Sequence, residues 1–241
     1  MRRSLAGVGL GVGLAYLGPS ITAGVPATRR LFRVRDRVAA GVALTFDDGP
    51  HPEATPAVLE LLAEANVSAT FFLVGEQVER RPELAARIVA QGHEVGLHCH
   101  RHTSLLRSGP RRTGDDLLRA QAVIEAATAR PIRLYRPPYG VLNAAALLTA
   151  GRAGWETWLW RQEGHDWEEA ATARSIMERL TRHVRSGDVL LLHDADHYAA
   201  PGSWRRTLEA LPLVLDELAR RNLPTHCLSP RQVDRMKVWT T

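Results

Sequence analysis

The sequence predicts a single α/β domain built around a parallel β-sheet, and three observations support this prediction. The chain has 241 residues, 45% of them hydrophobic, which is enough for one sizeable core with at most a short appendage. After residue 40, short apolar runs rich in β-forming residues alternate with longer segments of helical periodicity. No internal repeat or low-complexity linker divides the sequence. Strands alternating with helices indicate parallel pairing, and the pattern fits either a barrel or an open sheet.

Short runs with the composition of buried strands occur at Val42–Phe46, Ala69–Val74, Glu94–His98, Ile132–Arg136, Glu156–Trp160, Val189–His193 and Thr225–Leu228. The segments between them have the apolar spacing of helices, at about residues 56–65, 82–90, 115–129, 143–150, 171–184 and 204–221. Thr55 is placed to cap the first helix, with Pro56 at its first position. Gly92 ends the second helix, and Gly187 and Pro224 follow the last two.

The N-terminal residues differ in composition from the rest of the chain. A basic start precedes an uncharged stretch from Leu5 to Ile21. This pattern resembles a secretory signal peptide, with cleavage near Ala23 or Ala27. Left uncut, about 20 residues are enough to anchor a protein in a membrane. We therefore expect export to the cell envelope, with residues 1–30 either removed or kept as a membrane anchor and residues 38–241 forming the globular domain.

The basic balance of the chain does not indicate nucleic-acid binding. The formal net charge is +5, but no basic run is interleaved with aromatic residues. Lys237 is the only lysine, so an arginine-rich composition explains the charge more simply than a binding function does. The two cysteines, Cys99 and Cys227, lie far apart and indicate no disulfide framework. Nothing in the sequence indicates an oligomeric state.

Titratable residues gather where the predicted strands end. They are Asp47 and Asp48 after the first strand, His98 and His102 at and beyond the end of the third, Arg136 at the end of the fourth, Asp166 after the fifth and His193 at the end of the sixth. In a parallel α/β barrel the active site lies at the C-terminal ends of the strands. Taken singly, each residue also fits a structural role, but together they predict one site.

The aspartate and histidine pairs indicate a metal site. His98 and His102 are four residues apart, so on a helical turn they share one face and can bind one ion. On a strand, His98 and His100 would share a face instead. Asp47 and Asp48 can diverge beyond their strand, so that one binds the metal and the other contacts its water. Carboxylate and imidazole ligands suit Zn²⁺, and Co²⁺ or another borderline divalent ion also fits.

The later strand ends carry residues suited to proton transfer and substrate binding. Arg136 can form an ion pair with a carboxylate in the site. The rigid loop Pro137–Gly140 can present a backbone N–H to a substrate oxygen. His193, beside Asp166 from a neighbouring strand, has the features of a general acid. Leu191 shares a face with His193 and can wall a small apolar pocket.

Five motifs resemble those of the polysaccharide deacetylases, carbohydrate esterase family four, also called the NodB-homology domain. In order along residues 40–230 they are T-F-D-D-G-P, H-x-x-x-H, R-P-P-Y-G, D-W and L-x-H. The resemblance implies a distorted (β/α) barrel of about seven parallel strands, a glycan substrate and one divalent metal, usually zinc. By motif position, Asp47 is implied as the catalytic base, and Asp48, His98 and His102 as the metal ligands.

The same resemblance implies roles for the remaining motif residues. Arg136 would hold Asp47, the backbone N–H of Tyr139 would bind the oxyanion, His193 would be the acid, Asp166 would orient His193, and Trp167 and Leu191 would line the acetate pocket. Two positions depart from the family pattern. Cys99 stands where the family commonly has Ser or Thr, and Thr103 stands where Pro often follows the second histidine. Neither change removes a ligand.

The sequence therefore predicts a metal-dependent hydrolase that removes acetyl groups from N-acetylated sugars of a peptidoglycan- or chitin-like polysaccharide. Asp47 would take a proton from a water that the metal activates, and His193 would protonate the departing amine. The alternatives are an O-deacetylase of an acetylated glycan, a deformylase or deacetylase of a lipid-linked sugar, and a non-catalytic glycan-binding pseudoenzyme. The last is disfavoured because the base, ligands and acid are all present.

Overall fold

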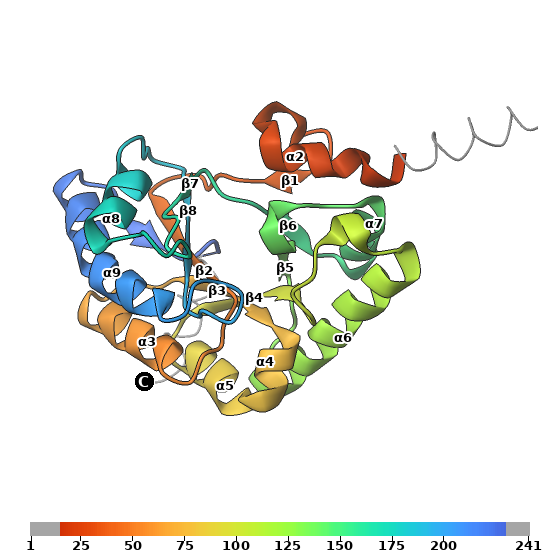
Figure 1. Cartoon of the computed structure of the whole chain (residues 1–241), viewed down its shortest axis with the longest axis horizontal. Helices are drawn as coiled ribbons and strands as arrows, with labels where there is room; N and C mark the ends of the chain where they lie inside the picture. The colour runs from red at the N-terminus through yellow and green to blue at the C-terminus, as the bar shows by residue number, and fades with distance from the viewer. Residues whose placement is uncertain (1–14, 230–241) are drawn as a thin grey trace, which may run out of the picture.

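A parallel β-sheet curled into a half-barrel forms the centre of the molecule, as seen in a computed structural model that describes residues 15–229 (Figure 1). The strand order is β1-β6-β5-β4-β3-β2-β8-β7, each neighbouring pair is parallel, and β9 pairs with the start of β2. The strands are β1 Val34–Arg35, β2 Val42–Asp47, β3 Thr70–Val74, β4 Glu94–Cys99, β5 Leu134–Tyr135, β6 Glu156–Trp158, β7 Gln162–Glu163, β8 Val189–His193 and β9 Thr225–His226. Within residues 15–229, no strand ladder joins β1 to β7. The prediction of a distorted parallel (β/α) barrel is confirmed.

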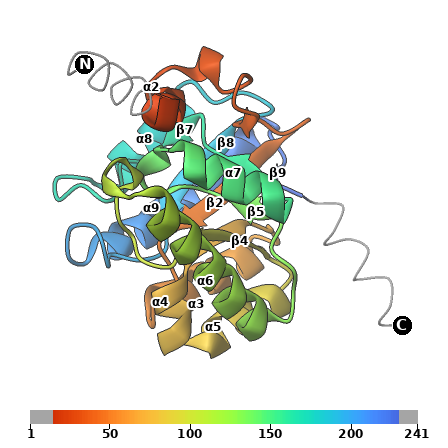
Figure 2. The same cartoon turned by 90° about the vertical axis from the view of Figure 1, so that its right-hand side faces the viewer.

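Helices surround the curled sheet (Figures 1 and 2). The longer ones are α3 Ala54–Glu64, α4 Gly75–Arg80, α5 Pro82–Ala90, α6 Pro110–Thr128, α7 Ala144–Ala153, α8 Ala173–Thr181 and α9 Ser203–Arg220. Neighbouring helices contact one another in the pairs α3–α9, α8–α9, α5–α6 and α6–α7. Most of these helices follow a strand and return the chain to the same end of the sheet, which makes the strand pairing parallel.

Alternation along β2 separates the hydrophobic core from the functional site. Val42, Leu44 and Phe46 belong to the main core cluster, which also contains Val58 and Leu62 of α3. Successive side chains of a strand point to opposite faces, so the intervening residues of β2 point away from α3. The strand is buried throughout, and its last residue, Asp47, is therefore a buried carboxylate at the C-terminal end of the sheet.

Strand register brings the polar strand ends together. Asp47 pairs with His193 of β8, and Leu97, the residue before His98, pairs with Tyr135, the residue before Arg136. Because all of these strands are parallel, their C-terminal ends lie at one end of the barrel. Register therefore places the predicted titratable residues of β2, β4, β5 and β8 around a common centre.

Several expected boundaries differ from those observed. The prediction that Thr55 caps the first helix is wrong, because α3 begins at Ala54 and the Thr55 hydroxyl donates instead to Asp194. Helix α6 begins at Pro110 rather than near residue 115, since proline is well suited to the first helical turn. The strands expected at 132–136 and 225–228 pair with neighbours over only two residues each.

Three short elements were not expected from the sequence. Helix α4 follows β3 directly, with no turn residue between them, so the apolar run of β3 hides its start. Strand β7 contains only Gln162–Glu163, and β1 pairs with β6 through Val34–Arg35, before residue 38, where we expected the domain to begin. Two-residue strands have no alternation of their own and exist only through their partners.

Part of the N-terminal segment packs against the barrel. Residues 1–14 lie outside the described structure, but the hydroxyl of Tyr16 donates a 2.7 Å hydrogen bond to Ser108 O. The guanidinium of Arg29 is buried and donates to Thr22 O, to Asp36 and to the carbonyl of Trp160. Among residues 15–229, no helix is both long and apolar enough to cross a membrane.

Candidate metal centre and active site

A buried ion pair fixes the first carboxylate of the site. Arg136 is fully buried, and its Nη1 donates to Asp47 Oδ1 at 2.8 Å and to Thr45 Oγ1 at 2.7 Å. The guanidinium lies 4.2 Å from the ring centre of Phe72 and 5.5 Å from that of Trp160, so aromatic faces hold it from the sides. Asp47 Oδ1 thus accepts from Arg136. The other carboxylate oxygen, Oδ2, lies 4.0 Å from His98 Nε2.

Asp48, His98 and His102 converge on one point. Asp48 Oδ1 lies 3.4 Å from His98 Nε2 and 3.3 Å from His102 Nε2, and the three potential ligand atoms all lie within 4.8 Å of one another. Asp48 takes a positive φ of 78°, which turns its side chain away from the direction of Asp47. The two adjacent carboxylates therefore separate, one toward Arg136 and one toward the imidazoles.

The chemistry of this cluster fits a divalent metal. Asp48 Oδ1 is buried and has no hydrogen-bond partner among the described residues. Burial raises the pKa of Asp48, but the neighbouring imidazoles outweigh it and hold the pKa well below its usual value. Burial lowers the pKa of His102 to about 4, so its ring is neutral near pH 7 and has a lone pair to donate. Three ligands of this kind leave coordination positions free, as in catalytic zinc sites.

The two histidines do not lie on a helical turn, so that part of the prediction is wrong. His98 is in β4, which extends to Cys99, and His102 follows in an irregular segment. The chain reverses beyond the strand and brings the second ring back to the first, with ring centres 5.2 Å apart. His100 points elsewhere, toward α4, where its Nε2 lies 3.8 Å from Glu79. His98 and His102 are therefore the two histidines that lie together, as predicted. A reversal of the chain after β4, and not a helical turn, brings them together.

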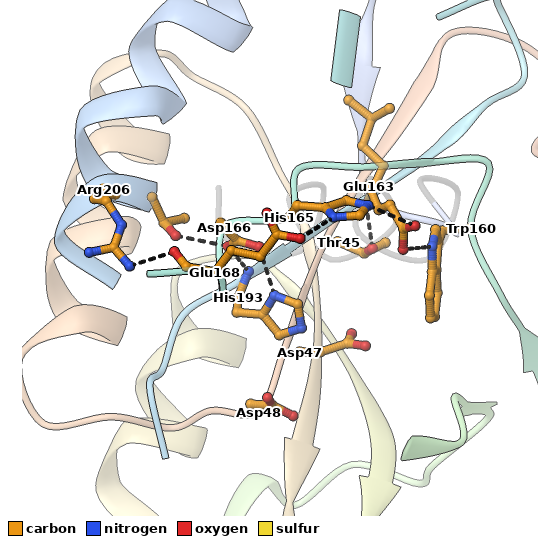
Figure 3. Close-up of polar contacts among 12 residues, drawn as sticks. Thr45, Asp47, Asp48, Trp160, Glu163, His165, Asp166, Glu168, His193 and Arg206 are labelled. Carbon is orange, nitrogen blue, oxygen red and sulfur yellow. Dashed lines mark hydrogen bonds and ion pairs between the residues drawn. The ribbon is translucent and has the colours of Figure 1, made fainter. Parts of the chain in front are cut away.

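The carboxylate of Asp166 contacts both the ring and the backbone N–H of His193 (Figure 3). Asp166 Oδ1 lies 2.9 Å from His193 Nδ1, while Oδ2 accepts from His193 N at 2.7 Å and from the Thr207 hydroxyl at 2.8 Å. This arrangement leaves Nε2 of His193 directed toward Asp47 and Asp48. Burial alone would lower the pKa of His193, but the Asp166 carboxylate outweighs it and raises the pKa to about 10.

The remaining predicted site residues surround this centre. Tyr139 lies in the loop after β5 with a positive φ of 58°, and its ring meets His102 edge-on, with ring centres 4.6 Å apart. Trp167 lies edge-on to His193, with ring centres 5.3 Å apart. Leu191 is buried two residues before His193, on the same face of β8. Two aromatic side chains thus border the titratable groups, and the role predicted for Leu191 stays a prediction.

Sequence reasoning missed Asp194, a further buried carboxylate next to the centre. It accepts a hydrogen bond from Thr55, and burial raises its pKa to about 7. A side chain at Gly49 would collide with this carboxylate, so the turn after Asp48 can pass over Asp194 only as glycine. The sequence signal that could have pointed to Asp194 is its position directly after His193.

Tyr198 was also missed. Its ring stacks on His102 with centres 4.3 Å apart. No motif marks this residue, because it lies in the loop between β8 and α9 and reaches His102 only through the fold.

Comparison with known proteins identifies relatives of the whole arrangement. The family model for polysaccharide deacetylases matches residues 35–158. A peptidoglycan-N-acetylglucosamine deacetylase of Bacillus cereus is 36% identical over 182 residues, which cover 75% of this chain and 82% of the relative. A chitooligosaccharide deacetylase of Bradyrhizobium sp. is 36% identical over 197 residues, which cover 78% of this chain and 88% of that protein.

Solved structures agree with these sequence matches. The Bc1960 peptidoglycan N-acetylglucosamine deacetylase superposes with a TM-score of 0.75 at 26% identity, over 84% of this chain and 94% of that chain. A family 4 acetyl xylan esterase from Clostridium thermocellum, in complex with a cobalt ion, superposes with a TM-score of 0.68 at 27% identity, over 82% of this chain and 91% of that one.

Proposed function

This chain belongs to the polysaccharide deacetylase family, and on that premise we propose that it removes acetyl groups from N-acetylglucosamine units of a peptidoglycan- or chitin-like glycan. It is a polysaccharide N-deacetylase, a hydrolase of non-peptide carbon–nitrogen bonds. The substrate proposal rests on the N-acetylglucosamine-containing glycans named for its relatives. Of the two glycans, we favour peptidoglycan because the expected export of the chain would bring it to the cell wall.

A single observation carries the proposal: a complete set of hydrolytic groups meets at one end of the barrel. Three groups lie around one centre. They are the Asp47 carboxylate paired with Arg136, the ligand cluster of Asp48, His98 and His102, and the His193 ring paired with Asp166. A fold that needed only stability would gain nothing by burying so many charged groups together. The site therefore has the composition of a working enzyme and not of a glycan-binding pseudoenzyme.

We propose zinc as the metal, held by Asp48, His98 and His102. Zinc suits one carboxylate and two imidazoles, and Co²⁺ suits the same donor set. A bound divalent ion supplies Lewis acidity, which polarises an amide carbonyl and lowers the pKa of water toward about 7.

The residues of the chain account for the proton transfers. Asp47 is the base that accepts the proton of the attacking water, because Arg136 holds one of its oxygens and leaves the other facing the cluster. His193 is the acid that protonates the amine nitrogen as the carbon–nitrogen bond breaks, since Asp166 keeps its ring protonated near neutral pH. The backbone N–H of Tyr139 supports the oxyanion.

Acetate release from a panel of substrates tests this function. Purified protein loaded with Zn²⁺ should release acetate from peptidoglycan and chitooligosaccharides, and a chelator should abolish the reaction. The Asp47→Asn protein, still loaded with metal, is the matched inactive control. Metal-free protein with full activity, or no release from any N-acetylated glycan, would contradict the proposal.

An O-deacetylase is the second candidate, because the superposed acetyl xylan esterase has the same fold. An ester could use the same base and the same ligand cluster, and its alcohol leaving group depends less on an acid than an amine does. Acetylxylan therefore belongs in the panel. An acetylxylan rate above that on chitooligosaccharide would favour the ester reaction.

We also propose that the protein is exported to the cell envelope. The support is the uncharged stretch Leu5–Ile21 after a basic start, together with glycan-acting relatives. Fractionation of expressing cells and mass spectrometry of the N-terminus test this proposal. Protein recovered only from the cytosol with an intact N-terminus would contradict it.

A further inference from the structure

The two histidine ligands differ in how their rings are held. A ligand histidine almost always donates its second ring N–H to an oxygen, which fixes the ring orientation. His98 has such a partner, because its Nδ1 lies 2.7 Å from the carbonyl oxygen of Arg136. His102 Nδ1 is buried and has no hydrogen-bond partner among residues 15–229. No hydrogen bond from the described residues therefore orients the His102 ring.

Two tyrosine rings enclose His102. Tyr198 lies nearly parallel to it, with ring centres 4.3 Å apart and an interplanar angle of 13°. Tyr139 meets it edge-on, with centres 4.6 Å apart and an angle of 66°. A parallel face on one side and an edge on another restrict rotation about the bond that carries the imidazole. Nε2 then stays directed at Asp48 Oδ1, 3.3 Å away.

Tyr198 is itself fixed at its far end. Its hydroxyl donates to Glu76 Oε1 at 2.7 Å and accepts from Gln77 Nε2 at 3.1 Å. Both partners lie at the start of α4, which follows β3. A ring tied at its hydroxyl to a helix cannot slide away from the imidazole that it covers.

The loop that carries Tyr198 is braced as well. Asp196 accepts from Gly202 N at 2.6 Å, and Ala200 N donates to the carbonyl of Trp167 at 3.2 Å. His197 Nε2 lies 3.4 Å from the carbonyl oxygen of Pro50. The loop between β8 and α9 is thus connected to the turn that carries Asp48 and to the segment that carries Trp167.

We propose that Tyr198 is a positioning residue for the metal centre, which sets the ring plane of His102 by face-to-face contact in place of the missing hydrogen bond. Glu76 and Gln77 hold the tyrosine hydroxyl and so transmit the position of α4 to the ligand. Tyr198 touches neither the substrate nor the metal in this role. The inference rests on the proposed metal site.

Two substitutions separate the ring from the hydroxyl. Tyr198→Leu and Tyr198→Phe both lose the hydroxyl, so any difference between them reports the aromatic face. Tyr198→Leu should weaken Zn²⁺ binding on the order of tenfold, because partners that orient a ligand are worth about 10- to 100-fold in metal affinity. Tyr198→Phe loses only the anchor at the far end of the ring, so its metal affinity should fall by no more than about threefold, because the stacked ring remains. Competition with a chromophoric chelator measures both affinities.

Cobalt substitution adds a readout that does not depend on turnover. The visible absorption of bound Co²⁺ reports ligand geometry, so the Tyr198→Leu spectrum should broaden or shift while the Tyr198→Phe spectrum matches the parent. In the full-length chain, with residues 1–30 kept, Tyr16→Leu is a matched control, because Tyr16 also donates from its hydroxyl but to Ser108 O. Its metal affinity should equal that of the parent protein.

The outcomes distinguish this inference from the proposed function. Parent protein that binds no divalent ion would overturn the metal site itself. Parent protein that binds Zn²⁺, with Tyr198→Leu binding equally well and giving the same Co²⁺ spectrum, would overturn only the role of Tyr198. Equal losses in Tyr198→Leu and Tyr198→Phe would also overturn it, because the hydroxyl and not the ring face would then matter.

Discussion

The strand-borne half and the loop-borne half of the site are held by different kinds of contact. The strand-borne half consists of Asp47, His98, Arg136 and His193, and each of these makes a hydrogen bond or ion pair of 2.7 to 2.9 Å with a buried partner. The loop-borne half consists of His102, Tyr139, Trp167 and Tyr198, whose side chains meet their neighbours mainly through ring faces and edges.

The two kinds of contact fix the side chains of the site to different degrees. Hydrogen bonds to strand residues fix an atom in both distance and direction, which suits groups that transfer protons. Ring contacts fix a plane but tolerate small shifts along it. His102 combines both halves, since it contributes a ligand atom to the strand-borne cluster but is oriented by loop-borne rings.

Removing one of the three proposed metal ligands should have the largest effect. His98→Ala deletes one of three ligands, and Asp48→Asn replaces a charged oxygen with a neutral amide. Both proteins should lose most of the bound metal, which should be about one ion per chain in the parent, and activity should disappear with it. Metal analysis after gel filtration measures this. Either variant retaining a full complement of zinc would remove that residue from the ligand set.

Asp47→Asn should separate catalysis from metal binding. Asp47 is paired with Arg136 and is not one of the three converging ligands. The variant should keep the metal and the fold, while kcat falls by on the order of 10²- to 10⁴-fold through loss of the base. Parallel measurement of bound zinc and kcat decides the question. If Asp47→Asn loses metal as Asp48→Asn does, and activity only tracks metal content, Asp47 is a ligand and not a base.

The pH profile tests His193, the proposed acid of the strand-borne half. His193 acts as an acid only when protonated, and its pKa is raised to about 10, so activity should be lost as pH rises through that region. Asp166→Asn removes the charge that raises the pKa, so the alkaline limb should move to lower pH by about one unit or more. A bound divalent cation lowers this pKa in both proteins and leaves the direction unchanged.

Thr207→Val is the matched control for that shift. It removes one hydrogen bond to Asp166 and leaves the carboxylate charge in place. Its alkaline limb should therefore move much less than that of Asp166→Asn. Superimposable profiles for Asp166→Asn and the parent protein would show that Asp166 does not tune His193.

The smallest effect is expected at the histidine between the ligands. His100 points toward α4, with Nε2 3.8 Å from Glu79, and makes no contribution to the ligand cluster. His100→Ala should keep the parent metal affinity, whereas His102→Ala should bind metal weakly. Isothermal titration of the two metal-free proteins with Zn²⁺ compares them. The opposite result would mean that His98 pairs with His100 in solution.

The strand-borne half could be predicted from sequence, and the reason is local. Asp47, Arg136 and His193 each end an apolar run, and parallel pairing then brings such ends together without further information. His102 was predicted from its spacing to His98, although the helical turn assumed for that spacing is absent.

The loop-borne contacts could not be predicted, because they depend on distances in the fold. Tyr198 is 121 residues from Gln77 and 122 from Glu76, and Thr207 is 41 residues from Asp166. Nothing in the local sequence of the loop after β8 marks Tyr198 as a neighbour of a metal ligand. Helix α4, which fixes its hydroxyl, was also not expected. Contacts of this kind appear only once the register of the sheet is known.

The buried guanidinium of Arg29 has a consequence for maturation. A peptidase that cut after Ala23 or Ala27 would release Thr22, whose carbonyl accepts from Arg29 Nε at 3.0 Å. The other Arg29 contacts, to Asp36 and to the carbonyl of Trp160, would remain. The ring of Trp160 in turn lies beside the guanidinium of Arg136, which pairs with the proposed base Asp47. Cleavage at either position would therefore leave Arg29 Nε without this carbonyl partner, while the contact that joins Arg29 to Trp160 would stay in place.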